Sequence, residues 1–565
     1  MLLLTPPGFR PTEPLPSPSA PRLRWSLSTE TLVLLAALWF SVISNSAFRQ
    51  AALQGLEASA TSPVGFGIAA LVGVAALHAL LVGLVATRWT VRPLLAVLLL
   101  AAAFATHYMD RYGVYLDPTM LRNVLRTDWH EARELLSPSL LLHLAWQAAL
   151  PLLLLWRVQP APWPGLRRGV LRRAALVGAS LVVLVATVMS VFQPFASLMR
   201  NNKEMRYLIT PANALWSLAV VAGADARAQQ RPRQPIGLDA TPGPLASAPP
   251  RPQLVVVVVG ETARAANWGL TGYARDTTPQ LRGLPVISWP HATACGTNTE
   301  TSLPCMFAPV GRRDYDEARI RGSESLLHVA ARAGVGVTWR DNQSGCKGVC
   351  EGLPTQLVRD MAPAALCSEG RCLDEGLLHG LPEMLRSVRG TQLLVLHQLG
   401  NHGPSYFRRY PPAFAHFKPE CRHDDLHRCS REEVVNAYDN ALRYTDHVLA
   451  QLLQALQAAS GTVDSAVIYV SDHGESLGEA NLYLHGLPYA IAPDVQKQVP
   501  MFMWLSDGFA QVRGLDLACL RDRARQPAAH DHLFHTLLGL LDVRTSLLAP
   551  EWDLTRPCRR NGAPS

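Results

Sequence analysis

Long apolar segments occur only before about residue 220 of this chain, and they limit its fold more than any other feature. A helix needs roughly 20 mostly apolar residues to cross a bilayer. Five segments meet or approach that length, at about 31–48, 65–86, 94–109, 139–156 and 174–195. The sequence therefore predicts an α-helical transmembrane domain of five spans over residues 1–200, followed by a soluble domain.

The arginines of the apolar part predict how the spans are oriented. Three precede the first span, two separate the second from the third, and five separate the fourth from the fifth. They are Arg10, Arg22, Arg24, Arg88, Arg92, Arg157, Arg167, Arg168, Arg172 and Arg173. Because loops rich in Lys and Arg stay in the cytoplasm, the N-terminus is expected there. Five crossings then place everything after residue 195 outside.

The cysteines agree with that orientation. All ten lie between Cys295 and Cys558, and none is in the apolar part. An even number confined to one domain indicates disulfides formed in an oxidising compartment. A zinc cluster or free thiols in a cytosolic domain are the alternative, although no C-x-x-C pair supports a cluster. Short spacing favours Cys295 with Cys305, Cys346 with Cys350, Cys367 with Cys372 and Cys421 with Cys429, which leaves Cys519 with Cys558.

Two polar stretches connect or follow the spans. Residues 110–138 are predicted to form a polar helix against the outer face of the membrane. Asn123, Thr127 and Glu131 recur at four-residue steps and would share one face of that helix, although spacing alone favours a solvated face. Residues 201–251 are expected to contain an amphipathic stretch at 201–219 and a linker at 224–251 rich in Pro, Ala, Gln and Arg.

Residues 252–565 repeat a pattern of strand, loop and helix. Strands are predicted at 254–259, 336–339, 392–397, 466–470 and 500–504, and helices at 323–333, 431–459 and 531–541. This alternation predicts an α/β sandwich with a largely parallel sheet. The formal net charge of +8 favours anionic membrane surfaces or phosphate-bearing ligands. Nucleic acid is not an expected partner, because no basic stripe with interleaved aromatic residues is present.

Ligand-type side chains follow two of the buried strands at their carboxyl ends, where open α/β sheets place their sites. Glu261 ends one strand, and Asp472 and His473 follow another. Mixed Asp, Glu and His ligation suits zinc, and also manganese. A metal there can lower the pKa of a coordinated hydroxyl, and Thr299 is the candidate nucleophile. Helix capping and a satisfied histidine are the alternative for each residue alone. Further candidates are His397, Asn401, His402 and His485.

Six motifs surround these residues. They are Gly260-Glu261-Thr262-Ala263-Arg264-Ala265; Cys295-Gly296-Thr297-Asn298-Thr299 with Pro304-Cys305-Met306-Phe307; Trp339-Arg340-Asp341-Asn342; Gly400-Asn401-His402-Gly403-Pro404; Ser471-Asp472-His473-Gly474-Glu475-Ser476-Leu477-Gly478-Glu479; and Tyr483-Leu484-His485-Gly486. Together they resemble the motifs of the lipid A phosphoethanolamine transferases, which include the mobile colistin-resistance enzymes. The resemblance covers nearly the whole chain. It implies that residues 252–565 are a periplasmic catalytic domain with the fold of the alkaline phosphatase and sulfatase superfamily.

The resemblance also implies a reaction in the inner membrane of a Gram-negative bacterium. Phosphatidylethanolamine would be the donor and a phosphate of lipid A, in lipopolysaccharide, the acceptor. Thr299 would attack the donor phosphorus, diacylglycerol would leave, and the phosphoethanolamine-threonine intermediate would react with the acceptor. The product would bind cationic peptides such as polymyxin less tightly. The enzyme is expected to be a monomer in contact with inner membrane lipid.

Residue roles follow from the same resemblance. Glu261, Thr299, Asp472 and His473 would hold one tightly bound zinc ion. His402 and His485 would serve a second zinc or the phosphoryl oxygens. Asp314 stands where the family often has the longer Glu. The residues implied for the donor head group are Asn123, Thr127, Glu131, Ser344 and Lys347.

Four other functions remain as alternatives. A phosphoethanolamine transferase acting on a core sugar or another periplasmic glycan is the nearest of them. A related phosphodiesterase or glycerol-phosphate transferase would use a similar threonine. A sulfatase would need a formylglycine precursor in a C-x-P-x-R type run, and no cysteine of the chain begins one. A membrane binding protein without activity would have no need for Glu261, Thr299, Asp472 and His473 together.

Overall fold

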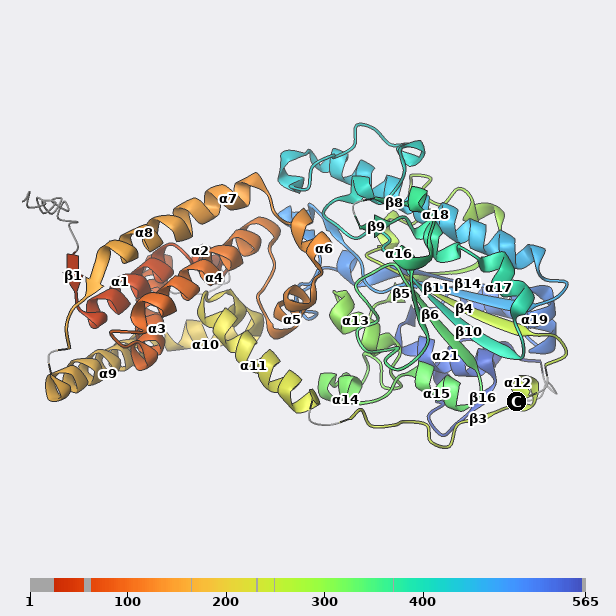
Figure 1. The fold of residues 1–565 in the computed structure, drawn as a ribbon, viewed down its shortest axis with the longest axis horizontal. Coiled ribbons are helices and arrows are strands. Elements are labelled where there is room, and N and C mark those ends of the chain that lie inside the picture. The colour runs from red at the N-terminus through yellow and green to blue at the C-terminus, as the bar shows by residue number, and fades with distance from the viewer. Residues whose placement is uncertain are drawn as a thin grey trace, which may run out of the picture.

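The computed structural model describes residues 25–54, 62–163, 165–229, 232–247, 249–368 and 370–560. Figure 1 shows two parts side by side along the long axis, a bundle of long helices from the first half of the chain and a sheet covered by helices from the second. Arg10, Arg22 and Arg24, on which the predicted orientation partly depends, lie outside the described residues.

Among the described residues, four helices are long and apolar enough to cross a membrane, and a bent pair is a fifth candidate. The four are α3 (Pro63–Val85), α4 (Val91–Tyr112), the continuous segment formed by α7 (Pro138–Leu144), η1 (Ala145–Ala149) and α8 (Leu150–Arg157), and α9 (Leu166–Ser190). The predicted first span is divided into α1 (Thr29–Val42) and α2 (Ser46–Gln54), with a bend of 50°. Asn45 stabilises this break, because its buried amide donates to the carbonyl oxygens of Phe40 and Thr210 at 2.9 and 2.6 Å.

The prediction of one helix over 110–138 is wrong, because the segment forms two short helices, α5 (Pro118–Arg126) and α6 (Trp129–Glu134). Thr127 ends α5 in an extended conformation, and its hydroxyl donates to the carbonyl oxygen of Asn123 at 2.8 Å. Asp128 then accepts a hydrogen bond from the backbone N–H of Glu131 at 3.0 Å and begins α6. Asn123, Thr127 and Glu131 therefore do not share one helical face.

The helical bundle ends with α10 (Phe192–Asn201), a short 3-10 turn (Lys203–Leu208) and α11 (Ala212–Gln229). Because α11 continues to Gln229, the predicted linker at 224–251 begins later than expected. α11 packs against α5, and the hydroxyl of Ser217 donates to the carbonyl oxygen of Leu116 just before α5. The chain then enters the second part through β3 (Thr241–Pro242) and α12 (Pro244–Ser247).

Eight strands form the central sheet, in the order β15–β5–β14–β11–β4–β10–β6–β7. Their bounds are β4 (Gln253–Gly260), β5 (Ile287–Thr293), β6 (Gly336–Asp341), β7 (Thr355–Leu357), β10 (Thr391–His397), β11 (Asp464–Ser471), β14 (Gln498–Leu505) and β15 (Ala528–Ala529). The strands from β11 to β7 are parallel, whereas β14 is antiparallel to its neighbours β11 and β5. The predicted α/β sandwich with a largely parallel sheet is thus confirmed.

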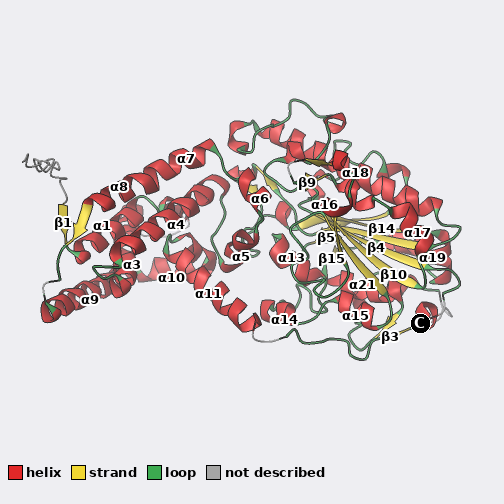
Figure 2. Cartoon of the chain, viewed as in Figure 1, coloured by secondary structure: helices red, strands yellow, loops and turns green. Residues whose placement is uncertain are grey.

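Helices cover both faces of this sheet (Figure 2). Successive side chains of β4 point to opposite faces. Val255, Val257 and Val259 belong to a core shared with α15 (Leu326–Arg332) and α21 (Asp531–Leu541). Leu254, Val256 and Val258 pack in a second core with α17 (Leu381–Ser387) and α18 (Arg431–Ala458). Because both faces of the sheet are buried by apolar side chains, we expect a polar site at the carboxyl ends of the strands.

The ten cysteines form the five pairs that their spacing predicts. Cys295–Cys305 joins the loop before α13 (Thr299–Met306) to that helix. Cys346–Cys350 closes a loop after β6, and Cys367–Cys372 joins β8 (Cys367–Ser368) to β9 (Arg371–Cys372). These three disulfides therefore constrain segments that follow or flank the strand ends.

Candidate metal centre and adjoining cavity

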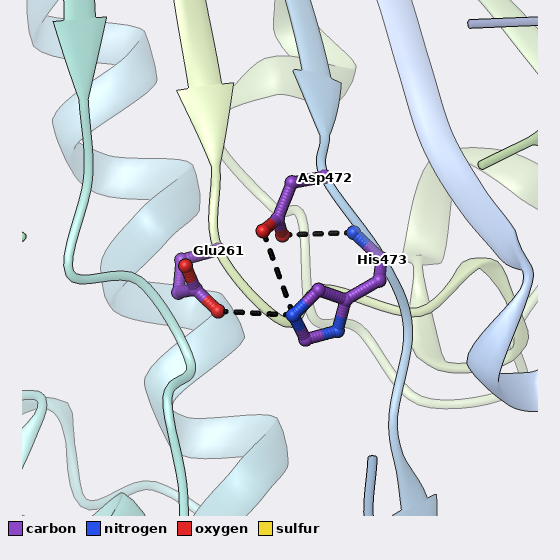
Figure 3. A group of neighbouring side chains, drawn as sticks. All are labelled: Glu261, Asp472 and His473. Atoms are coloured by element: carbon purple, nitrogen blue, oxygen red, sulfur yellow. Dashed lines mark hydrogen bonds and ion pairs between the residues drawn. The ribbon is translucent and has the colours of Figure 1, made fainter. Parts of the chain in front are cut away.

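The carboxyl ends of β4 and β11 bring Glu261, Asp472 and His473 together. The two strands are paired in parallel, with Gly260 opposite Ser471, so the residues that follow them meet at one edge of the sheet. His473 Nε2 lies 3.3 Å from Glu261 Oε1 and 3.5 Å from Asp472 Oδ2 (Figure 3). One ligand atom from each residue falls within 4.8 Å of the others, and all three side chains are fully buried.

This donor set fits a divalent metal ion. Asp472 Oδ2 is buried and has no hydrogen-bond partner among the described residues. Burial and the charge of Glu261 raise the pKa of Asp472 to about 6. Burial alone would lower the pKa of His473, but the neighbouring Asp472 and Glu261 raise it to about 10. Two buried carboxylates thus share one imidazole. A divalent cation bound by the two carboxylates and the histidine would neutralise the negative charge of the carboxylates.

Thr299 places its hydroxyl beside this group. It is the first residue of α13, and the side chain of Asn298 caps that helix by accepting from the backbone N–H of Thr301 at 2.9 Å. Thr299 Oγ1 donates to Glu261 Oε2 at 3.1 Å and lies 3.4 Å from His473 Nε2. The hydroxyl is therefore close to the proposed ligands and at the positive end of a helix.

His402 and His485 lie next to the same group. The ring centroids of His473 and His485 are 4.3 Å apart, and those of His402 and His485 are 5.6 Å apart. His402 Nε2 is 2.9 Å from Glu131 Oε1, so a residue of the helical part reaches the site. Burial alone would lower the pKa of His402, but the charge of Glu131 raises it. Burial lowers the pKa of His485 well below its ordinary value.

A cavity of about 390 Å³ adjoins the centre. Glu131, Gln343, Ser344 and His402 are among its lining residues. The Gln343 amide donates to Glu261 Oε2 at 3.0 Å, so the cavity reaches the candidate ligands. Lys347 is not a lining residue, but its Nζ donates to Ser344 Oγ at 2.7 Å. Of the residues expected to bind the donor, Glu131 and Ser344 thus line the cavity and Lys347 contacts it indirectly.

The other expected residues have different surroundings. Asn123, within α5, and Thr127, at its end, are not among the lining residues, although Arg126 and Asp128 on either side of Thr127 are. His397 is buried, and its Nδ1 pairs with Asp341 Oδ1 at 2.7 Å. Asp314 is exposed and pairs with Arg319 at 3.3 Å.

Several charged residues near the site belong to none of the sequence patterns described above. Glu300 follows the candidate nucleophile, and its buried carboxylate accepts from Arg126 Nη1 of α5 at 2.6 Å. Arg126, Arg359 and Arg371 line the cavity. The only sequence signal for Glu300 is its place beside Thr299. Arg359 and Arg371 come from short elements whose position depends on the tertiary structure.

Comparisons with known proteins agree with this architecture. Residues 74–226 match the family model described as phosphoethanolamine transferase EptA/EptB, and residues 253–543 match the model described as sulfatase. Phosphoethanolamine transferase EptA of Escherichia coli K12 is 38% identical over 543 residues, which cover 95% of this chain and 98% of that protein. The chain belongs to the phosphoethanolamine transferase family. It is accordingly an enzyme that transfers phosphoethanolamine.

Two further relatives support the membership. Phosphatidylethanolamine transferase Mcr-1 of Escherichia coli is 38% identical over 466 residues, which cover 81% of this chain and 84% of that protein. The structure of the integral membrane protein lipooligosaccharide phosphoethanolamine transferase A from Neisseria meningitidis matches with a TM-score of 0.90 at 35% identity, covering 95% of this chain and 100% of that one. The relatives therefore share both the helical part and the sheet domain.

Proposed function

We propose that this phosphoethanolamine transferase takes its group from phosphatidylethanolamine and delivers it to a phosphate of lipid A, with Thr299 as the nucleophile. The observation that carries the proposal is the position of Thr299 Oγ1, 3.1 Å from Glu261 and 3.4 Å from His473. A hydroxyl in that position can be deprotonated by its neighbours and can reach a phosphorus atom in the adjoining cavity.

The residues fit a zinc ion held by Glu261, Thr299, Asp472 and His473. When bound, zinc would favour the deprotonated hydroxyl and offset negative charge on the phosphoryl oxygens. Glu261 also orients Thr299 by accepting its hydroxyl hydrogen bond. His402 and His485 flank the group and are suited to contact phosphoryl oxygens or a second metal ion.

The reaction balances in two displacements. In the first, Thr299 Oγ attacks the donor phosphorus, the bond from phosphorus to the glycerol oxygen breaks, and the threonine proton ends on diacylglycerol. In the second, an acceptor phosphate oxygen attacks the phosphoethanolamine-threonine, the bond from phosphorus to Oγ breaks, and the acceptor proton ends on Thr299. No oxidant or other co-reactant is consumed.

Donor recognition is assigned to charges that match a zwitterion. Glu131 is suited to the ammonium group of phosphoethanolamine, and Ser344 and Lys347 to its phosphate. Asn123 and Thr127 would act indirectly, by ending α5 so that Glu131 enters the cavity. These separate roles agree with the two short helices, α5 and α6, whereas a shared donor-binding face would need one continuous helix.

Location follows from the same proposal. The protein would span the inner membrane as a monomer, with its N-terminus in the cytoplasm and the catalytic domain over residues 252–565 in the periplasm. Addition of phosphoethanolamine brings an ammonium group to lipid A, which weakens its attraction for cationic peptides such as polymyxin. Mass spectrometry of lipid A and of core sugars, from cells with and without the protein, distinguishes a lipid A acceptor from a core acceptor.

Thr299 is tested by intact-protein mass after incubation with phosphatidylethanolamine. Thr299→Ala should form no phosphoethanolamine adduct and show no transfer, because no hydroxyl remains. Thr299→Ser should retain part of the activity. Thr301→Ala, on the same helical turn, is the matched control and should still form the adduct. An adduct that persists in Thr299→Ala would disprove the assignment.

A further inference from the structure

We propose that Arg359 and Arg371 bind the phosphate group of the acceptor and act in the second displacement only. The inference rests on the proposed function, because it assigns a ligand to another part of the same cavity. The ligand class is a phosphate monoester anion carried by a larger molecule.

Both arginines come from short elements of the catalytic part. Arg359 lies in α16 (Val358–Met361) and Arg371 in β9, and both line the cavity that also contains Ser344 and His402. The Cys367–Cys372 disulfide closes the hairpin of β8 and β9 and so restrains the backbone of Arg371. Glu131, proposed for the donor ammonium, comes from α6 instead.

The charge of Arg371 is shared rather than neutralised by one partner. Its guanidinium pairs with Glu134, a buried carboxylate that also accepts from Arg409 Nη2 at 2.6 Å. Asp128 and Glu131 also stabilise the charge of Arg371, but Glu131 is itself paired with His402. Burial lowers the pKa of Arg371 to about 10, so the group remains protonated at neutral pH. The Arg371 guanidinium is therefore charged and can bind an anionic ligand.

Arg359 is held less firmly. Its side chain is 70% exposed and pairs with the adjacent Asp360 at 3.8 Å, longer than a hydrogen bond. A guanidinium can donate two parallel hydrogen bonds to phosphate oxygens. Arg359 can therefore turn from a weak surface pair to an anion that enters the cavity.

The two displacements differ in what the arginines would meet. In each one, the leaving and attacking oxygens lie roughly in line through phosphorus. Diacylglycerol therefore leaves from the side on which the acceptor later arrives, opposite Thr299 Oγ. Diacylglycerol carries no charge, whereas an acceptor phosphate monoester carries one or two negative charges. The proposal places Arg359 and Arg371 on that side, where cations favour the acceptor and contribute little to the first displacement.

The test measures the two displacements separately with the full-length protein in detergent. The first is adduct formation with phosphatidylethanolamine, followed by intact-protein mass. The second is loss of the adduct when purified lipid A is added. In Arg359→Ala we expect the first rate to stay within about twofold of the unaltered protein and the second to fall about tenfold, as for one lost hydrogen bond to a charged group. Arg359→Lys should recover part of the second rate.

Arg386→Ala is the matched control, because Arg386 is 71% exposed, pairs with Glu383 at 2.9 Å and is not a lining residue. Arg371→Lys keeps the charge beside Glu134 and should slow the second displacement through loss of the guanidinium geometry. Unchanged adduct loss in both Arg359→Ala and Arg371→Lys would overturn the inference. Equal slowing of both displacements would overturn it too, by placing the arginines on the donor. If the unaltered protein forms no adduct, the proposed function fails instead.

Discussion

The three candidate metal ligands form an arrangement that is unfavourable without a cation. Glu261 and Asp472 are both fully buried, and a buried carboxylate without a charged or hydrogen-bonding partner is costly. His473 offsets part of this charge, but Asp472 Oδ2 has no hydrogen-bond partner among the described residues. A bound metal ion would therefore stabilise the fold as well as serve the reaction.

Metal removal should consequently lower stability. A ligand present at a thousandfold excess over its Kd stabilises the folded state by about 4 kcal/mol. We expect chelation to lower the melting temperature of the purified protein by roughly 10 °C, and Asp472→Asn to remove most of the bound metal. Asp314→Asn is the control, because Asp314 is exposed and pairs with Arg319. Elemental analysis and thermal unfolding are the measurements, and full metal content in Asp472→Asn would contradict the ligand assignment.

For individual residues, the sequence predicts some of the contacts within the site and not others. Glu261 and Asp472 could be placed together because parallel strands bring their carboxyl ends to one edge of a sheet. Asn123 and Thr127 could not be placed, because four-residue spacing has meaning only if the helix continues. The hydroxyl of Thr127 instead bonds to the carbonyl oxygen of Asn123 where α5 ends. Arg371 gave no signal, because its position depends on a disulfide-closed hairpin.

Among the secondary-structure elements, the sequence predicts the buried strands. It does not predict a strand that contains proline or a break within an apolar helix. β4 and β11 are continuous apolar runs, so their identity follows from composition. The sequence does not predict β5, since that strand contains Pro290 and has an exposed residue, His291, in its interior. The division of the first span into α1 and α2 depends on hydrogen bonds between Asn45 and Thr210, a residue far along the chain, which local sequence does not reveal.

Two of the disulfides are expected to have different roles, one in the reaction and one in stability. Cys346–Cys350 closes the loop that carries Lys347 and follows Ser344, whereas Cys519–Cys558 joins α20 (Leu517–Arg523) to the C-terminal region. By loop-closure entropy they contribute about 2 and about 4 kcal/mol, respectively. Replacing the first pair with serines should therefore slow adduct formation more, and replacing the second should lower the melting temperature more. The reverse order in adduct formation would contradict a donor-binding role for the loop, and the reverse order in melting temperature would contradict the loop-closure estimate.

Across the whole protein, ion pairs join the helical part to the sheet domain. Arg111 at the end of α4 donates three hydrogen bonds to Asp425, at 3.1, 2.7 and 2.6 Å. Arg126 of α5 reaches Glu300, beside Thr299, and Glu131 of α6 reaches His402. Figure 1 shows α5 and α6 at the boundary between the two parts. The site is therefore built from both, which the motifs of the soluble half alone did not indicate.

The Arg111–Asp425 contact between the two parts makes the stability of the folded protein depend on pH. Burial alone would raise the pKa of Asp425, but the hydrogen bonds and charge of Arg111 lower it below its ordinary value of 3.8. A carboxyl group with a lowered pKa stabilises the folded state fully above its unfolded pKa, and the contribution is lost as pH falls through the folded pKa. Asp425→Asn should thus reduce stability by about 2 kcal/mol at pH 7, the scale of a hydrogen bond to a charged group, and by less below pH 4.

Thermal unfolding in detergent between pH 8 and pH 3.5 measures that difference. The gap between the unaltered protein and Asp425→Asn should be constant from pH 8 to about pH 5 and then narrow, because protonated Asp425 and Asn resemble each other. Asp276→Asn is the control, since Asp276 forms an exposed pair with Arg282 at 2.9 Å and such pairs contribute little. A gap that widens in acid, or an equal effect of both substitutions, would show that the Arg111–Asp425 pair does not hold the two parts together.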